Sequence, residues 1–130
     1  MKLEGEIRLP GDKSITHRAL LLSAISHGEA KLINYLISED TKATINALKS
    51  LGVSIDISKE YIKVVGRGFS GLKKPSKKID CQNSGTTARL LLGLLSGLDF
   101  ESILVGDESL SKRPMGRVVK HLLTLKGKIF

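Results

Sequence analysis

The sequence has little cysteine, few aromatic residues and no long apolar stretch, and each scarcity excludes a class of protein. A single cysteine, Cys81, excludes an internal disulfide framework and a cysteine-rich metal cluster. With no tryptophan and only 4% aromatic residues, the chain offers few of the platforms on which single-stranded nucleic acid stacks. No apolar run reaches the roughly 18 residues that cross a bilayer, and MKLEGEIRLP is neither a signal nor a transit peptide. We therefore expect a cytoplasmic protein with no membrane partner.

The chain does carry a marked excess of positive charge. Its formal net charge is +8 over 130 residues, of which 41% are apolar and 26% charged. This length and composition are typical of one globular domain with a modest core. A basic surface attracts nucleic acid, acidic lipid or phosphorylated metabolites. Because aromatic residues are scarce, the charge favours small phosphates or contacts with a phosphate backbone.

Hydrophobic patterning predicts a strand, a helix, a strand, a helix and a hairpin in the first half of the chain. Pro10-Gly11 ends the first strand, and Ser14 is expected to act as the N-cap of the first helix. Ser38-Glu39-Asp40 is a second cap signal, and Gly52 is expected to end the second helix. The expected ranges are 3–9 (strand), Ser14 to His27-Gly28 (helix), 30–37 (strand), 41–51 (helix), and 53–57 with 61–65 (hairpin).

The second half repeats this order. We expect strands at 78–82 and 101–105, a helix from Thr86 to about residue 95, a loop at 106–112, and a helix from Pro114 to about Lys126, with a last strand at 128–130. Similar segments recur about 70 residues apart, such as 47–55 and 122–130. The sequence therefore predicts an α/β (α+β) fold of repeated β-α-β-α-β-β units: unit one at about 1–67, a linker at 68–76, and an incomplete unit two at 77–130.

Three junctions between a loop and a helix carry basic and small polar residues. A helix N-terminus has unpaired N–H groups and about half a positive charge, so anions bind there readily. Arginine adds bidentate contacts to phosphate or carboxylate, and a glycine lets an anion approach the backbone closely. If the junctions converge, they form one anion site. The candidate residues are Lys13, Ser14 and Arg18; Asn83, Gly85, Thr86 and Arg89; and Arg113.

Each candidate also has a purely structural interpretation. Ser14 could be a plain helix cap, Arg18 and Arg89 could be solvated charges, and Gly85 could serve an ordinary turn. His17 is expected to be a packing or surface residue rather than a base, and Cys81 a small buried hydrophobe rather than a nucleophile. Gly11-Asp12-Lys13-Ser14 is not a Walker A loop, because an acid stands where that motif needs glycine.

Three segments together, LPGDKSITHRALLLSA, QNSGTTARLLLG and GDESLSKRPM, resemble the 5-enolpyruvylshikimate-3-phosphate synthase (3-phosphoshikimate 1-carboxyvinyltransferase) family. The resemblance covers essentially the whole chain, in the right order and spacing, and is to the N-terminal portion of the family. It implies a two-lobed enolpyruvyl transferase fold, of which this chain would be part of the first lobe. In that family the first strand usually completes the other lobe.

The resemblance also implies an activity. The family transfers the enolpyruvyl group of phosphoenolpyruvate to the 5-hydroxyl of shikimate 3-phosphate and releases phosphate, on the route to chorismate and the aromatic amino acids. It needs no metal or organic cofactor. Its partners would be these two small molecules, with no nucleic acid, and the full-length enzyme would be a monomer.

By resemblance, residues of the three segments take separate roles. Lys13, Ser14 and Arg18 would bind shikimate 3-phosphate, and Lys13, Gly85 and Arg113 would bind phosphoenolpyruvate. Asn83, Thr86 and Arg89 would support the loop. An alanine at Gly85 would crowd the inhibitor glyphosate, which occupies the phosphoenolpyruvate site in this family. Leu90 stands where many members have proline, and several bacterial members also have leucine there.

The family's acid–base residues, an aspartate and a lysine or glutamate, lie in the second lobe with its Lys-Glu-x-Asp-Arg stretch. Neither is in this sequence, so the catalytic residues are expected outside the chain, and the chain alone is expected not to turn over.

Three alternative assignments remain for the chain. They are the UDP-N-acetylglucosamine enolpyruvyl transferase, which normally uses a reactive loop cysteine; the more distant RNA 3′-terminal cyclase; and a basic nucleic-acid-binding module. The last is disfavoured because the basic residues cluster at helix starts and in one linker rather than along one face.

Overall fold

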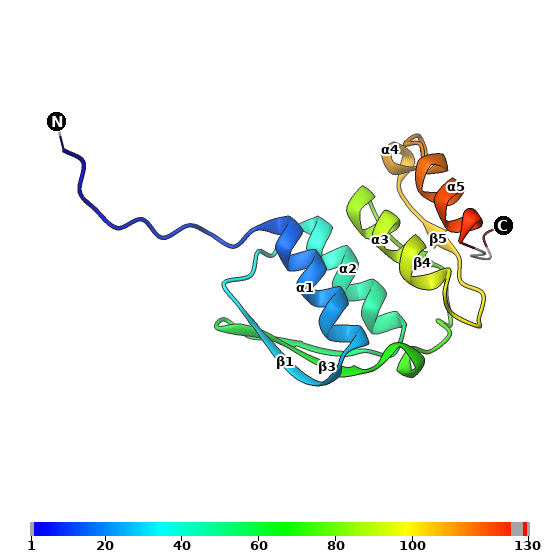
Figure 1. Cartoon of the computed structure of the whole chain (residues 1–130), viewed down its shortest axis with the longest axis horizontal. Helices are drawn as coiled ribbons and strands as arrows, with labels where there is room; N and C mark the ends of the chain where they lie inside the picture. Colours follow the sequence, from blue (N-terminus) through cyan, green and yellow to red (C-terminus); the bar gives the residue numbers. More distant parts are fainter. Residues whose placement is uncertain (1, 126–128, 130) are drawn as a thin grey trace.

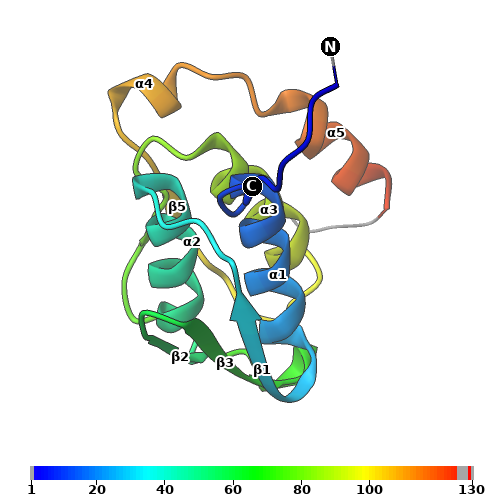
Figure 2. The same ribbon diagram turned by 90° about the vertical axis from the view of Figure 1, so that its left-hand side faces the viewer.

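The computed structural model describes residues 2–125 and 129 and places helices over one face of a three-stranded sheet (Figure 1). Helices α1 (Lys13–Ile25), α2 (Glu39–Ser50) and α3 (Gly85–Leu95) lie beside one another. Helices α1 and α2 pack on strands β1 (His27–Ile33), β2 (Ser54–Ile57) and β3 (Tyr61–Arg67). In the view turned by 90°, the N-terminal ends of the three helices point away from this sheet (Figure 2). The N-terminal ends of these three helices therefore share one side of the molecule.

The larger sheet is antiparallel throughout, in the order β1-β3-β2. Strand β1 pairs with β3 from His27 opposite Arg67 to Ile33 opposite Tyr61. Strands β2 and β3 form the predicted hairpin. The strand predicted at 30–37 is placed too late in the sequence. Strand β1 starts at His27, where its pairing with the seven residues of β3 begins. It ends before Asn34, because the φ of 51° at Asn34 interrupts the extended backbone.

A second, smaller sheet follows the 3₁₀ helix η1 (Phe69–Gly71). Strands β4 (Ile79–Asp80) and β5 (Leu104–Val105) pair in parallel, with α3 as the crossover between them. Beyond β5 come α4 (Glu108–Ser111) and α5 (Gly116–Thr124), and α5 packs on α3. This β-α-β order agrees with the pattern predicted for the second half of the chain.

One continuous apolar core joins the two sheets. Leu20 of α1 and Leu48 of α2 are fully buried against Ile62 and Val64 of β3, and Leu91 of α3 extends the core to β4. Burying one such side chain stabilises the fold by about 1.5–3 kcal/mol. Because helices from both halves contribute to this core, their N-terminal ends are held in a fixed relative position.

The predicted strand at 3–9 is wrong for this structure, since residues 2–12 have no strand or helix. The alternation of apolar and polar residues is real, but Leu3, Ile7 and Leu9 are 87%, 84% and 75% exposed. An extended segment becomes a strand only when another strand supplies its hydrogen bonds. No described strand of the chain pairs with this segment.

Four smaller predictions also need correction. Ser14 is not the N-cap of α1, because Asp12 takes that position. Ser26 caps the end of this helix, and His27 already belongs to β1. The expected loop at 106–112 contains α4, which Asp107 caps. Pro114 precedes α5 rather than opening it, since Met115 is the N-cap. The predicted strand at 128–130 and the end of the last helix at 126–127 lie outside the described residues, apart from Ile129, which is in no strand.

Candidate anion-binding site

The first junction is a tightly packed turn that leads into α1. Asp12 caps the helix: its Oδ1 accepts a hydrogen bond from the Ile15 N–H at 2.7 Å. A Cβ on Gly11 would lie 2.2 Å from the carbonyl oxygen of Asn34, so only glycine fits against that backbone. This cap displaces Ser14 into the first turn, where it is exposed. Its side chain is therefore free of the capping role that the sequence suggested.

Lys13, also in the first turn of α1, is held by the start of α2. Its Nζ donates to Oδ2 of Asp40 at 2.7 Å, with the two side chains 48% and 33% exposed. A partly exposed ion pair adds at most about 1 kcal/mol to stability. Its consequence is instead positional, because it directs the ammonium across the N-terminal end of α2. Sequence reasoning treated Asp40 only as part of a cap signal and missed this contact.

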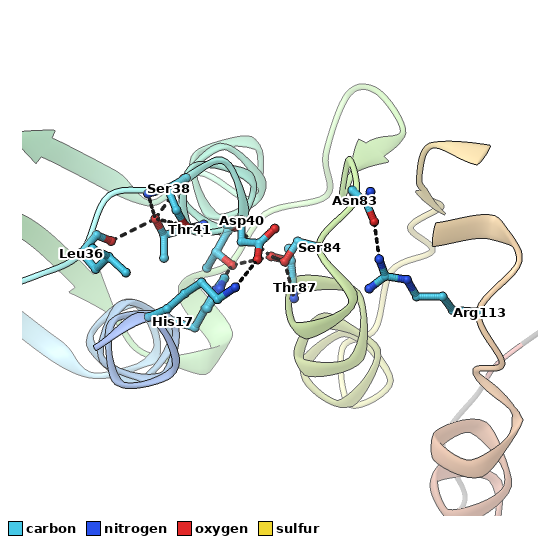
Figure 3. A network of polar contacts seen from close by, with 11 residues as sticks. His17, Leu36, Ser38, Asp40, Thr41, Asn83, Ser84, Thr87 and Arg113 are labelled. Atoms are coloured by element: carbon cyan, nitrogen blue, oxygen red, sulfur yellow. Dashed lines mark hydrogen bonds and ion pairs between the residues drawn. The ribbon is translucent and has the colours of Figure 1, made fainter. Parts of the chain in front are cut away.

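A buried chain of polar groups connects the three helices beneath this ion pair (Figure 3). His17 Nδ1 lies 2.7 Å from Thr44 Oγ1, and Thr44 Oγ1 lies 2.7 Å from Thr87 Oγ1. Thr87 Oγ1 donates to Ser84 Oγ at 2.7 Å and lies 3.3 Å from the backbone carbonyl oxygen of Asp40. Sequence analysis identified none of these hydrogen bonds. The sequence signal that was available is the four-residue spacing of Lys13 and His17, which puts the histidine on the same face of α1 as a candidate site residue.

The second junction carries Gly85 as the first residue of α3. Ser84 caps this helix by accepting a hydrogen bond from the Thr87 N–H at 3.1 Å. A Cβ built on Gly85 would lie 2.5 Å from Arg89 Nη1 and 3.2 Å from Arg113 Nη1. Two guanidinium groups therefore approach the same backbone position at a helix N-terminus. Both can donate in the fork geometry that carboxylate and phosphate accept.

Arg113 reaches Gly85 from the third junction, between α4 and α5. Its Nη2 donates to Oδ1 of Asn83 at 2.5 Å (Figure 3). Arg89, one turn into α3, donates to the carbonyl oxygen of Pro114 at 3.4 Å. The second and third junctions thus hold each other through two arginines. Arg113 nevertheless lies between helices and not at a helix N-terminus, in contrast to the prediction.

The predicted site residues divide into two sets. Lys13, and the group Asn83, Gly85, Arg89 and Arg113, lie at the ends of α1 and α3 that the buried polar chain joins. Ser14, Arg18 and Thr86 are exposed, and their side chains make no hydrogen bond or ion pair to another described residue. Ser14 and Arg18 are four residues apart on α1, so they share a face and remain available to a ligand.

Burial changes the pKa of two groups near the site. It lowers the pKa of His17 below 6.5; the Asp40 carboxylate opposes this by a smaller amount, and Lys13 and Arg18 reinforce it. Burial also raises the pKa of the Cys81 thiol to about 11, with Asp80 adding to the effect. His17 is therefore neutral at pH 7, and Cys81 is a protonated, fully buried thiol. Both residues pack inside the protein, as the sequence indicated.

The described residues include no cluster of three or more histidine, cysteine, aspartate or glutamate side chains placed to hold a metal ion. Among the same residues, no helix has the length and apolar character needed to cross a bilayer. Three basic side chains, those of Lys13, Arg89 and Arg113, lie near the N-terminal ends of α1 and α3. Basic groups beside a helix N-terminus are chemically suited to bind and orient an anion.

Comparison with known proteins agrees with this picture. A family model described as EPSP synthase (3-phosphoshikimate 1-carboxyvinyltransferase) matches residues 1–130. The 3-phosphoshikimate 1-carboxyvinyltransferases of Limosilactobacillus fermentum and Leuconostoc citreum are 48% and 46% identical over 127 residues. Each alignment covers 98% of this chain, and the chain spans only 29% and 30% of these two relatives.

Solved structures show the same relationship in three dimensions. EPSP synthase from Acinetobacter baumannii superposes with a TM-score of 0.91 at 42% identity, over 95% of this chain and 28% of that chain. A second structure of EPSP synthase from Acinetobacter baumannii gives a TM-score of 0.92. The predicted α/β fold and the resemblance drawn from three short segments are both confirmed. With its sequence matched from end to end and its fold superposed on solved members, the chain belongs to the EPSP synthase family.

Proposed function

We propose that this chain binds the two anionic substrates of enolpyruvyl transfer, phosphoenolpyruvate and shikimate 3-phosphate. In this reaction the enolpyruvyl group moves to the 5-hydroxyl of shikimate 3-phosphate and phosphate is released. One observation supports the proposal above all: Arg89 and Arg113 converge on Gly85 at the start of α3, while Lys13 stands at the start of α1 in the same polar network. Relatives that are 46–48% identical are named 3-phosphoshikimate 1-carboxyvinyltransferase.

Phosphoenolpyruvate is assigned to the Gly85 side of the site. Its carboxylate and phosphate both accept paired N–H donors, which two guanidinium groups supply. No side chain at Gly85 stands between the start of α3 and the two guanidinium groups, so an oxygen atom bound by the arginines could also accept from an N–H group of the first turn. Asn83 holds Arg113 in place through its Oδ1, so the arginine loses little conformational freedom on binding.

Shikimate 3-phosphate is assigned to the start of α1. Lys13, Ser14 and Arg18 offer an ammonium, a hydroxyl and a guanidinium within one and a half turns of the helix N-terminus. Lys13 faces the neighbouring helices through Asp40, which suits a role shared between the two substrates. Holding both molecules in these positions would bring the hydroxyl and the enolpyruvyl carbon together and lower the entropic cost of reaction.

The chain spans less than a third of its relatives, so we propose that it binds these anions weakly and does not turn over by itself. It offers donors that stabilise charge, whereas the acid–base residues implied by the resemblance stand outside it. Coupled phosphate release from the chain at millimolar substrate should equal the buffer blank. Turnover at an enzyme-like rate would refute this part of the proposal.

We further propose that the protein acts in the cytoplasm and that the reaction needs no cofactor. The chain would divide into units at 1–67 and 77–130, joined by a linker at 68–76.

A thermal-shift series tests the binding function. Shikimate 3-phosphate and phosphoenolpyruvate should raise the melting temperature, because ligands that bind only the native state stabilise it. A short oligonucleotide at moderate salt should not, because non-specific binding to a phosphate backbone weakens steeply with salt. Stabilisation by the oligonucleotide alone would favour a nucleic-acid-binding module, and stabilisation by UDP-N-acetylglucosamine would favour the related transferase.

A further inference from the structure

The polar side chains buried between α1, α2 and α3 form a single directed chain of hydrogen bonds. His17, Thr44 and Thr87 are fully buried, and Ser84 is 2% exposed. The three contacts that join them, His17 to Thr44, Thr44 to Thr87 and Thr87 to Ser84, all measure 2.7 Å. Each hydroxyl has only one proton, so the direction of one bond constrains the next.

The acceptors at the Ser84 end of the hydrogen-bond chain favour one direction. Thr87 Oγ1 donates its proton to Ser84 Oγ, or to the backbone carbonyl oxygen of Asp40 at 3.3 Å, and a carbonyl can only accept. A Thr87 hydroxyl that donates to either of these acceptors accepts from Thr44. Since Thr44 has then used its one proton, it must accept from His17. With the bonds in this direction the ring nitrogen that faces Thr44 carries a hydrogen, which makes neutral His17 the Nδ1–H tautomer.

The other ring nitrogen has an unusual environment. His17 Nε2 is buried and has no hydrogen-bond partner among the described residues. In the Nδ1–H tautomer this nitrogen is a bare lone pair, which is less costly to bury than an unpaired N–H or a charge. The unpartnered nitrogen and the direction of the hydrogen-bond chain thus point independently to the same tautomer.

The two ends of this chain lie next to the two halves of the proposed site. His17 follows Lys13 by four residues on α1, so the two side chains share a face. Ser84 is the N-cap of α3 and immediately precedes Gly85, on which Arg89 and Arg113 converge. We propose that His17 is a positioning residue whose Nδ1–H, through Thr44 and Thr87, holds the Gly85 junction at a fixed place relative to Lys13. The consequence for substrate binding rests on the proposed function; the positioning itself does not.

Two substitutions of similar polarity separate this role from simple packing. The side-chain amide nitrogen of asparagine lies at the same distance from the backbone as Nδ1, whereas that of glutamine corresponds to Nε2. His17→Asn can therefore still donate to Thr44, and His17→Gln cannot do so from the same position. Both variants are polar amides. If His17 only filled space, the position of the amide nitrogen would not make one variant better than the other.

The first measurement needs no ligand. A long-range ¹H–¹⁵N spectrum of the labelled chain at pH 7 reports the tautomer of each histidine ring, and loss of one set of signals in His17→Asn assigns His17. The expected result is a protonated Nδ1 and a bare Nε2. An Nε2–H tautomer or an imidazolium would overturn the inference, whatever the chain binds.

The second measurement follows the Gly85 junction. The backbone amide signals of Gly85 and Thr86 should move in His17→Gln and stay near their wild-type positions in His17→Asn. Equal signals in wild type and His17→Gln would overturn the positioning role. If His17→Gln does not fold, Thr44→Val, which removes the hydroxyl, and Thr44→Ser, which keeps it, test the same link, and equal Gly85 signals in these two would overturn it.

Titration with phosphoenolpyruvate then connects positioning to function. We expect the affinity of His17→Gln to fall about tenfold, the loss expected from one hydrogen bond, while that of His17→Asn stays within about twofold of wild type. If wild type shows no binding, the proposed function of the chain fails, while the tautomer and the amide signals still decide the inference. Equal affinities for wild type and His17→Gln would overturn its extension to substrate binding.

Discussion

Thr44 of α2 and Thr87 of α3 place their hydroxyl oxygens 2.7 Å apart in a fully buried position. They come from the two halves of the chain, 43 residues apart, and this contact is one of the polar links between α2 and α3. It also connects His17 on one side to Ser84 on the other. A buried polar contact between packed helices specifies how the helices are arranged as well as how stably they pack.

Removing the hydroxyls of Thr44 and Thr87 together should destabilise the chain by less than the sum of the two single losses. Thr44→Val leaves the His17 N–H without its acceptor and removes the hydrogen bond between Thr44 and Thr87, so the free energy of unfolding should fall by about 1–3 kcal/mol. Thr87→Val should have a similar cost, and the double variant should cost less than the sum. Urea unfolding of the three variants measures this coupling. Strictly additive losses would mean that the two hydroxyls do not interact.

The pH dependence of stability should reveal His17. Its pKa is lowered by burial from 6.5 in the unfolded chain, so between the folded and the unfolded pKa the unfolded state binds more protons. The stability from neutral His17 is thus complete above pH 6.5 and is lost as the pH falls from about 6.5 through the folded pKa. Thermal melts from pH 7.5 to 5 measure this effect. The His17→Asn variant should show a shallower slope, and an equal slope would contradict the assignment.

Gly66 of β3 should not tolerate alanine. A Cβ there would lie 2.2 Å from the carbonyl oxygen of Ser23 and 2.3 Å from that of Ser26, both backbone atoms that cannot move easily. Gly66→Ala should lower the unfolding free energy by about 1–3 kcal/mol. The matched control is Gly93→Ala in α3, where no atom lies within 4 Å and helix propensity predicts a gain of about 0.5–1 kcal/mol. Urea unfolding that ranked the two variants in the opposite order would disprove the close approach of α1 to β3.

Lys13 and Lys42 form a matched pair of lysines with opposite expected roles. Both make a partly exposed ion pair near the start of α2, to Asp40 and Glu39, and their side chains are 48% and 49% exposed. Each change to alanine should alter stability by less than about 1 kcal/mol. Only Lys13→Ala should weaken shikimate 3-phosphate binding, by about 10–100-fold for one charge-assisted contact. Calorimetric titration giving equal losses for both variants would mean that the basic surface binds anions without a defined site.

A methyl group at Gly85 should disturb the phosphoenolpyruvate side of the site. The Cβ of Gly85→Ala would lie 2.5 Å from Arg89 Nη1 and 3.2 Å from Arg113 Nη1. Both are ends of flexible side chains, so the fold should persist while the guanidinium groups move apart. We expect phosphoenolpyruvate affinity to fall about tenfold, and glyphosate to lose affinity with it. Titrations of Gly85→Ala and of Gly93→Ala, the control in the same helix, measure this. Unchanged binding of both anions would place the phosphoenolpyruvate site elsewhere.

Periodicity alone located most of the helices and strands of this chain. The hairpin of β2 and β3 and the cap at Ser38 were predictable because their signals are local: alternation around a short turn, and a hydroxyl before an apolar periodic run. The strand expected at 3–9 failed for the opposite reason. Its alternation is as clear as that of β2, but a strand depends on a partner, and pairing is not encoded within the segment itself.

The candidate site shows the same division. The residue types at each junction made Lys13, Gly85 and Arg113 candidates for an anion site, because basic side chains and an accessible backbone at a helix start favour anions. Asp40 and Thr44 escaped notice because each is unremarkable beside its sequence neighbours. Their roles arise only from residues 27 positions away, Lys13 and His17 respectively.

The sequence by itself determined the chemical character of this protein: short-range periodicity set its helices, and it placed basic and small residues near the helix starts. Tertiary structure alone decided which of those residues meet. Burial of one shared apolar core brings α1, α2 and α3 together, and that packing turns His17 into a neutral donor and gathers Arg89 and Arg113 at Gly85. The physical reason is range: capping and periodicity act within a few residues, whereas desolvation and hydrogen bonding between helices exist only once distant segments are packed.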